Sequence, residues 1–403
     1  MLLVAMFAFE VAGTVDVSDR ARIYAYEREA IIGDGIAFDI ENTPRLHLGL
    51  DWPVTSLDLE YAPRLFWQDV DGPAASPTLL LHSGGLSLSS RRERLSLTLA
   101  QTFSVGDQSF ARLSVERDLL EPEPAATPAP TGGGSPSPEL ELVPGPMVVE
   151  VVEAESSASL RYDWSRRVST ELRPSFGVSG GADAAALRAL PRQRTARVDG
   201  ALDYRASRRD TLTTSAAVAQ TAISNGYDHL LVSLMETWSR SFAPESGVAL
   251  GAGAALQETT GPAGSSETQS QPIGAARAWH TVHGRAVHVY LRSDLGYQPH
   301  INVLTGSFQH RLFASAGATT IAGSSSATFT LGAAQTFPLD EPDTAQSLTA
   351  DLVLEQALLD WLSAELGGQM VWQSLGGDGL FATSESRWLL FAGARAELPS
   401  VRF

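Results

Sequence analysis

One segment of the chain matches a sequence pattern that surrounds catalytic serines. Residues 177–181 read Gly-Val-Ser-Gly-Gly, which fits the G-x-S-x-G pattern. A nucleophilic serine in that pattern requires a strand-to-helix turn and later Asp and His partners. Here the pattern closes a predicted strand and opens a loop, so we interpret it as a glycine-rich strand end. The sequence therefore predicts no catalytic residue and no enzymatic activity.

Histidines are the next candidates, because five of the eight lie between His280 and His310 and residues 279–283 contain H-x-x-H. A two-residue turn at 284–285 would pair Thr281 with His288 and place His280 and His288 on opposite faces of a sheet. Ligands on opposite faces cannot share one metal ion. We therefore predict no metal site and no cofactor, and expect these histidines to be polar wall and interface residues.

Composition removes further classes of function. The 403 residues carry 46 acids and 29 bases, for a net charge of -17, and the sequence contains neither Lys nor Cys. Without Cys there are no disulfides, thiolate zinc sites or cysteine nucleophiles. Nucleic-acid binding needs a basic face, which this acidic chain does not predict.

The elements that must position the polar residues are strands. In residues 95–103 the apolar side chains occupy the odd positions, and similar alternation recurs at 160–164, 198–204 and 287–295. A period of two residues is typical of a strand with one apolar and one polar face.

The connections between these segments alternate between short turns and longer segments, of which 104–155, 180–194, 29–42 and 258–271 are the longest. Short turns at one end and long loops at the other are typical of transmembrane β-barrels. The count is 18 strands, an even number that places both ends of the chain beside the short turns. The predicted strands are 17–28, 43–51, 55–67, 78–89, 93–103, 156–164, 168–179, 195–205, 210–223, 229–239, 247–257, 272–283, 286–297, 307–318, 325–337, 345–357, 363–374 and 386–398.

Two segments test this count. Residues 345–366 are good helix formers, and a helix there would reduce the barrel to 16 strands. We favour strands, which place Leu348, Ala350, Leu352 and Leu354 outward. The connection 104–155 contains a Pro/Gly/Ser-rich stretch and has a net charge of -8, from 10 acids and 2 Arg. Such a composition predicts an acidic loop outside the membrane.

A membrane barrel is favoured over a soluble sandwich because open sheets rarely exceed about 10 strands and because lipid requires every backbone group to pair. Aromatic residues also gather at the predicted strand ends, where a membrane barrel carries its interfacial girdles. Tyr61 and Phe337 share this placement. The predicted girdle consists of Trp52, Trp67, Trp164, Tyr204, Trp238, Tyr297, Trp372 and Trp388.

Charged residues occupy the opposite faces of these strands, where a hydrated lumen would accept them at little cost. Both signs are present, which suits neutral or weakly charged polar solutes, including sugar chains. The predicted lumen-lining residues are His47, Arg161, Asp163, Glu171, Arg173, Arg197, Asp199, Asp203, Arg277, His288, Tyr290, Arg292, Asp294, Asp351, Glu355 and Glu365.

The start and the turns of the chain carry two further signals. Residues 1–12 begin with an apolar run too short to span a bilayer, and we interpret them as the remnant of a signal peptide or a disordered start. The predicted short turns form a basic rim that would meet headgroups or an anionic partner. The rim consists of Arg91, Arg92, Arg94, Arg166, Arg167, Arg208 and Arg209.

The chain resembles the Gram-negative outer-membrane β-barrels. The terminal Phe403, with Val401, is similar to the last-strand signal that the barrel assembly machinery reads, although Pro399, Glu397 and Arg395 depart from it. More narrowly, residues 57–65 and 81–88 resemble early strands of the porins associated with exopolysaccharide secretion systems.

The resemblance implies a porin-like passive conduit in the outer membrane that exports a polysaccharide. It also implies outer-membrane lipid, the assembly machinery, the polymer and a periplasmic polysaccharide export protein as partners. Two alternatives stay open at this point. One is a general or solute-selective diffusion porin, and the other is a soluble secreted β-rich binding protein.

Overall fold

The computed structural model describes residues 12–28, 35–68, 78–109, 148–302, 307–338, 344–376 and 383–402. These residues form antiparallel strands and one short helix. The strands are β1 (Ala12–Arg28), β2 (Gly35–Trp52), β3 (Thr55–Tyr61), β4 (Arg64–Gln68), β5 (Thr78–Arg92), β6 (Leu95–Ser109), β7 (Val148–Asp163), β8 (Val168–Gly181), β9 (Gln193–Arg205), β10 (Asp210–Ile223), β11 (Asp228–Ala243), β12 (Ser246–Thr260), β13 (Ser266–His283), β14 (His288–Asn302), β15 (Ser307–Ala322), β16 (Ser325–Pro338), β17 (Thr344–Leu359), β18 (Leu362–Gly376), β19 (Thr383–Glu397) and β20 (Val401–Arg402).

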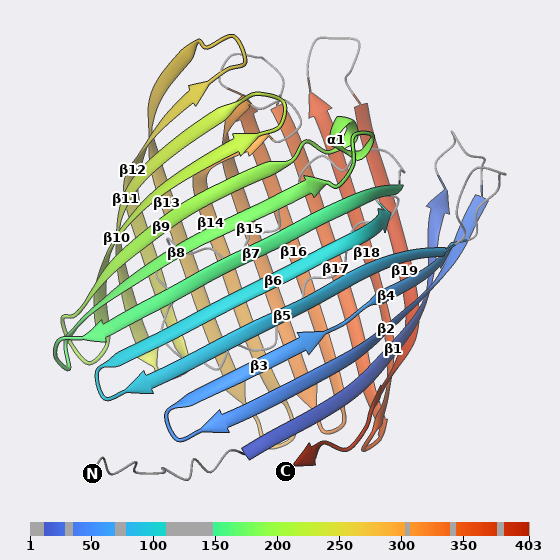
Figure 1. The fold of residues 1–403 in the computed structure, drawn as a ribbon. Helices are drawn as coiled ribbons and strands as arrows, with labels where there is room; N and C mark the ends of the chain where they lie inside the picture. Colours follow the sequence, from blue (N-terminus) through green and yellow to red (C-terminus); the bar gives the residue numbers. More distant parts are fainter. Residues whose placement is uncertain are drawn as a thin grey trace, which may run out of the picture.

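The strands close into a single barrel, shown in Figure 1. Each strand pairs with its neighbours in the sequence, and β1 pairs with β19 to complete the ring. With β3 and β4 as two halves of one strand and β20 as the end of the last, the described residues form an 18-stranded barrel. The prediction of a closed antiparallel barrel of about 18 strands is confirmed. β1 begins at the end that carries the short turns, and β20 pairs there with its first residues.

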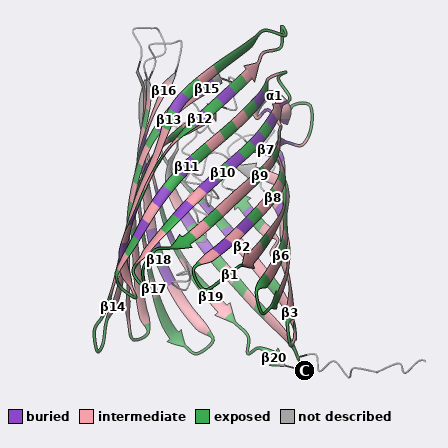
Figure 2. Cartoon of the chain, turned by 90° about the vertical axis from the view of Figure 1, so that its left-hand side faces the viewer, coloured by how far each residue is buried: buried purple, intermediate pink, exposed green. Residues whose placement is uncertain are grey.

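The two faces of the wall differ as the alternation predicts. Large apolar side chains such as Leu250, Leu366 and Leu390 are more than half exposed on the outward face. Charged and hydroxyl side chains occupy the positions between them and point inward. The resulting alternation of burial is visible in Figure 2 along strands such as β10 and β11. An outward apolar face with every strand paired is what a bilayer requires.

One predicted strand, 55–67, is interrupted in the structure. It splits into β3 and β4 at Ala62 and Pro63 because proline has no N–H to donate to a neighbouring strand. The gap is held by Ser83 of β5, whose carbonyl accepts a hydrogen bond of 2.9 Å from the Ala62 N–H. The strand keeps its course across the break, since β5 pairs with both halves.

Several strands run further than predicted, and the loops are correspondingly shorter. The predicted long connection 258–271 is wrong, because β12 and β13 pair as far as Thr260 with Ser266. Within the predicted loop 104–155, β6 continues to Ser109 and β7 begins at Val148. These segments are polar and apolar in mixture, so their alternation is weak, and cross-strand pairing extends them. The rest of that loop and residues 1–11 lie outside the described residues.

The segment with strong helix propensity forms strands. β17 and β18 pair along 344–376, and Leu348, Leu352 and Leu354 lie outward as predicted. Tertiary pairing therefore overrides local propensity here. The helix α1 (Ala186–Ala189) stands in the connection between β8 and β9, where Ala186 packs against Leu81, Val149 and Val151. No helix in the described part of the chain is long and apolar enough to cross a membrane.

Candidate functional site: the inward wall

Every residue predicted to line the lumen lies on the inward face of its strand, to judge by the pairing register and by the ion pairs that link these residues. Most belong to β7–β9, β13–β14 and β17–β18. The structure collects them into separate clusters, two of which contain inward residues that the sequence did not single out.

The first cluster lies where the barrel closes. Arg22 of β1 donates to Glu365 of β18 from Nε at 2.9 Å and from Nη2 at 2.8 Å, and Arg20 lies 3.1 Å from the same carboxylate. β19 runs between β1 and β18, so the Arg22 side chain must pass over it. It does so at Gly393, where a Cβ would lie 2.8 Å from Arg22 Cγ.

The same cluster continues onto β2 and β4. The Tyr24 hydroxyl donates to Glu41 Oε2 at 2.5 Å, and Arg64 Nε donates to Glu41 Oε1 at 3.2 Å. The Arg22 guanidinium stacks over the Phe391 ring at 4.6 Å. Ion pairs and a cation–π contact thus tie β18, β19, β1, β2 and β4 together across the closure.

The second cluster spans β7 to β9. Glu171 accepts hydrogen bonds from Arg173 at 2.5 Å and Ser159 at 2.7 Å. Arg161 lies within 4 Å of Asp163, Glu171 and Asp203, so one guanidinium serves three carboxylates. Acids exceed bases in this cluster. On β9, Arg197 pairs with Asp199, two residues along on the same face, at 2.7 Å.

The third cluster lies on β13 and β14. Asp294 is held between two arginines, with Arg277 Nε at 2.5 Å from one carboxylate oxygen and Arg292 Nε at 2.7 Å from the other. The predicted register of this hairpin is wrong by two residues. Thr281 pairs with Tyr290 and His283 with His288, because the turn spans four residues, 284–287, rather than two.

Among the tryptophans of the described strands, Trp279 faces inward. It lies directly opposite Arg292. Its ring lies against Gly247 of β12, where a Cβ would be 2.4 Å from the ring carbon Cζ2. Glycine at 247 therefore lets the indole lie close to the wall. The sequence did not place Trp279 among the lumen residues.

Histidines join the wall in two other arrangements near the short turns. The Nδ1 atoms of His283 and His288 lie 2.9 Å apart, and His283 Nε2 is 2.9 Å from Glu245. His47 lies between Asp16 at 3.1 Å and Asp58 at 3.3 Å. His280 faces outward and contacts Ser246. Among the described residues, no group of three or more His, Cys, Asp or Glu side chains is arranged to hold a metal ion.

Between these clusters, long stretches of the inward wall carry small and hydroxyl side chains, interrupted by larger residues such as Met235, Gln257 and Arg311. On β5 and β6 these are serines and threonines, such as Ser87 and Thr98. On β10, Thr213, Ser215 and Ala217 follow one another, and β12 presents glycine and alanine. Short side chains leave room in the lumen, and hydroxyls donate and accept hydrogen bonds.

The predicted girdle residues lie on the outward face near strand ends. Trp52, Trp164, Tyr204 and Trp238 lie at the end with the short turns, where Trp238 Nε1 donates to Asp210 at 3.2 Å. Trp67, Tyr297, Trp372 and Trp388 lie toward the opposite end. Trp361, in the turn between β17 and β18, is an exposed aromatic that the predicted girdle did not include.

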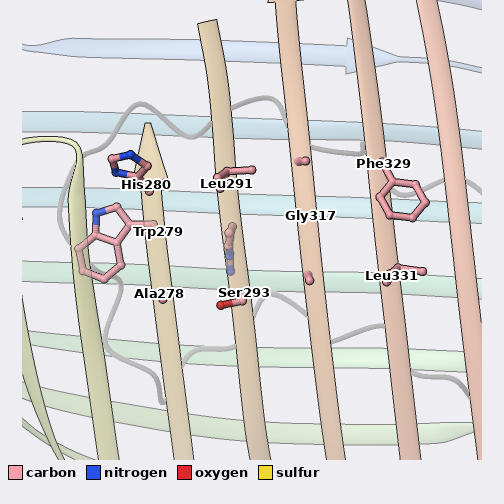
Figure 3. A pocket seen from close by; sticks show the side chains of 11 residues that line it. Ala278, Trp279, His280, Leu291, Ser293, Gly317, Phe329 and Leu331 are labelled. Carbon is pink, nitrogen blue, oxygen red and sulfur yellow. The ribbon is translucent and has the colours of Figure 1, made fainter. Parts of the chain in front are cut away.

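A shallow hollow on the outer wall, over β13 to β16, is distinct from the lumen. Figure 3 shows it with the opposite wall of the barrel behind. Its floor is made by small residues such as Ala278, Ser293 and Gly317, and its sides by Leu291 and Phe329. An apolar hollow on the lipid side is not a path for a polar solute.

The short turns carry the predicted basic rim, since all seven of its arginines are exposed. The turn 207–210 is fixed by Ser207, whose hydroxyl donates to Asp210 Oδ2 at 2.7 Å. β20 pairs Val401 with Val15 and so continues the last strand past Pro399. The predicted assembly signal at Phe403 lies outside the described residues.

The inward residues that the sequence reasoning missed include several of the first strand. Arg20, Arg22 and Tyr24 share one face of β1, and period-two spacing alone would have grouped them. Their partners Glu41, Arg64 and Glu365 come from other strands, and no local pattern indicates those contacts.

Solved structures with a similar fold share little sequence. The FrpB iron transporter from Neisseria meningitidis superposes with a TM-score of 0.52 at 6% identity, over 96% of this chain and 82% of that one. The outer membrane protein OpdK from Pseudomonas aeruginosa gives a TM-score of 0.43 at 8% identity, over 96% of this chain and 99% of that one. At 6% identity the likeness to FrpB shows the barrel fold alone.

Sequence comparison is more specific. The model of the EpsX exopolysaccharide export family matches residues 2–357. No curated protein matches the sequence significantly.

Proposed function

The chain belongs to the EpsX exopolysaccharide export family, and from this premise we propose how the barrel passes its polymer. Closed antiparallel barrels with an outward apolar band are outer-membrane proteins. The protein is thus a porin-like outer-membrane conduit for exopolysaccharide export, and the resemblance identified from the sequence is confirmed. The open matter is how the inward wall moves a sugar chain.

The observation that carries the proposal is the composition of that wall. Its charges are largely paired within the wall, as in Arg22–Glu365, Arg173–Glu171 and Arg197–Asp199. Paired charges create only a weak long-range field, while hydroxyl and small side chains fill the spaces between them. A long sugar chain would therefore meet many exchangeable hydrogen-bonding groups and few strong binding points, which is what passage requires.

We propose that transport is passive and involves no covalent step. The G-x-S-x-G segment supports this, because Ser179 lies within β8 and pairs with Glu153 and Gln193 in the sheet rather than standing on a strand-to-helix turn. The polymer enters from the periplasm already assembled, and the wall contributes hydration and positioning.

The proposed partners meet different parts of the barrel. Outer-membrane lipid contacts the outward apolar face and the aromatic girdle. The assembly machinery would read the last strand and Phe403. A periplasmic polysaccharide export protein would dock on the basic rim, where the exposed arginines of the short turns project.

Deletion of the gene tests the function directly. We expect surface polysaccharide to be lost and polymer or its precursors to accumulate inside the cell envelope, with restoration by the wild-type gene. Unchanged surface polymer would reject the export function. If uptake of small sugars fell while surface polymer stayed normal, the barrel would be a diffusion porin instead.

Docking on the rim has its own test. Replacing Arg166, Arg167, Arg208 and Arg209 by Gln should reduce surface polymer without reducing the amount of folded barrel. The matched control replaces Arg194, an exposed residue of β9 away from the short turns, by Gln. Equal export by both variants would reject the rim as the docking surface.

A further inference from the structure

We propose that the inward face of β13 and β14 is a binding subsite for acidic sugar residues, built from Trp279, Arg277, Arg292 and Asp294. The proposal rests on the export function and names a substrate class for it. A polymer passing this face would place a sugar ring on the indole and a carboxylate on the guanidinium groups.

The aromatic part of the subsite is a fixed platform. Trp279 faces the lumen, whereas the tryptophans of the predicted girdle face lipid. One side of its ring rests on the wall at Gly247, where any side chain would collide with the indole. The other face of the indole ring is turned toward the lumen. Sugar rings present C–H groups on their apolar faces, and a flat aromatic surface with its negative face exposed attracts them.

The charged part of the subsite has a cation excess. Arg277 and Arg292 each use Nε to contact the single carboxylate of Asp294. Guanidinium carries five N–H donors, so the terminal nitrogens of both side chains are left with donors for a ligand. Arg292 is 44% exposed at its side chain, and Arg277 is 27% exposed. Asp294 thus holds two guanidinium forks in place without neutralising both.

The other clusters lack this combination. Around Arg161 one guanidinium meets three carboxylates, so acids are in excess there. At the closure, the Arg22 side chain is only 8% exposed and lies over Phe391. On the part of the wall that the structure describes, β13 and β14 bring together a lumen-facing indole and exposed guanidinium groups in directly opposite positions.

Position and chemistry together indicate the ligand class. Trp279 and Arg292 are cross-strand neighbours, whose Cβ atoms lie about 5 Å apart in an antiparallel pair. A ring stacked on the indole would therefore carry its exocyclic substituent near the guanidinium. A planar carboxylate there can accept two parallel hydrogen bonds from arginine. Uronic acids offer both a ring that can stack on the indole and a carboxylate that can bind arginine. Neutral hexoses offer only the ring.

Calorimetric titration of the purified full-length barrel in detergent would test this. We expect tetragalacturonate to bind about tenfold more tightly than the neutral cellotetraose. Arg292→Gln should remove most of that preference while leaving cellotetraose binding unchanged. Trp279→Ala should weaken both ligands, and Trp279→Phe should restore part of the affinity because it keeps a ring.

Two variants serve as matched controls, Arg194→Gln on the outside of β9 and Trp67→Ala in the girdle, and both should bind like the wild type. Resistance to unfolding in cold SDS identifies variants that fold. Equal affinity for the acidic and neutral tetrasaccharides, no binding of either, or no effect of Arg292→Gln would overturn the subsite. Those outcomes leave the export function intact, which loss of surface polymer on gene deletion tests independently.

Discussion

Glu365 is the residue on which the ion pairs of the closing cluster converge. Its side chain is 2% exposed and accepts hydrogen bonds from Arg22, with Arg20 also in contact. Leaving a buried polar group without its partner destabilises the fold by far more than the intact pair stabilises it. Single residues of the wall thus contribute to stability according to how deeply they are buried, which no sequence count of charges conveys.

Glu365→Gln should therefore lower the free energy of unfolding by about 1–3 kcal/mol, since it leaves the Arg22 charge without a counter-ion. Urea titration of the barrel in lipid vesicles, followed by tryptophan fluorescence, measures this. The control is Glu397→Gln, whose side chain is 53% exposed and pairs with Arg395. Exposed pairs contribute little, so a loss as large for Glu397→Gln would contradict the role of burial.

Gly393 is a second residue with a specific steric role. A Cβ there would lie 2.6 Å from the carbonyl oxygen of Ala21 and 2.8 Å from Arg22 Cγ. Gly393→Val should force the Arg22 side chain aside and destabilise the barrel by about 1–3 kcal/mol. Gly200→Val is the matched control, because its nearest neighbour would be 4.0 Å away. The temperature at which each variant unfolds on SDS gels compares the two. An unchanged unfolding temperature for Gly393→Val would argue against the passage of the Arg22 side chain over Gly393.

At the scale of elements, β17 shows how pairing decides between helix and strand. Its outward face carries Leu352, level with Gly368 of β18, and its inward face carries Asp351, opposite Gln369. Leu352→Arg would place a charge in lipid and should cost about 2–4 kcal/mol. Gln369→Arg places the same charge inward beside Asp351 and should be tolerated. Vesicle-based urea titration distinguishes them, and equal tolerance would reject the assigned faces.

Elements were also the scale at which sequence reasoning was most successful. Alternation located nearly every strand and assigned the faces of β7 to β9, because that pattern is local. Register was less predictable: the 283–288 turn has four residues rather than two, and the pairing of β13 with β14 shifts with it. Strand ends beyond the apolar band, as in β12 and β13, depend on cross-strand pairing, which alternation does not measure.

At the scale of the whole molecule, closure is the property that local patterns cannot predict. Arg22 and Glu365 are separated by 343 positions in the sequence, and they meet only because the first strand pairs with the last. One of the three charged clusters of the candidate site, the cluster on β18, β19, β1, β2 and β4, depends on that event. The clusters on β7–β9 and on β13–β14 involve neighbours in the chain, so their members were accessible to prediction.

Closure can be tested with cysteines, since the chain contains none. Ala21 and Ala394 are paired, outward-facing and small, so the double variant Ala21→Cys with Ala394→Cys should form a disulfide on mild oxidation. The bridged chain should migrate differently from the reduced chain on denaturing gels. Ala21→Cys with Ala364→Cys spans two strand spacings, about 9.5 Å, which exceeds the reach of a disulfide. Bridging in both pairs, or in neither, would contradict the closed ring.

The guanidinium groups of the wall have one further consequence. Every cation in the lumen clusters is arginine, and arginine stays protonated at any pH that a bacterium meets. A wall built with lysine would lose charge in alkaline surroundings, and a wall built with histidine would lose it near neutrality. Here the positive side of each arginine contact is constant, so any response of export to external acidity must originate in the cargo, in the carboxylates or in the wall histidines His47, His283 and His288. External acidity thus changes the charge of the polymer and of the titratable side chains of the wall, while the arginines of the wall keep their charge.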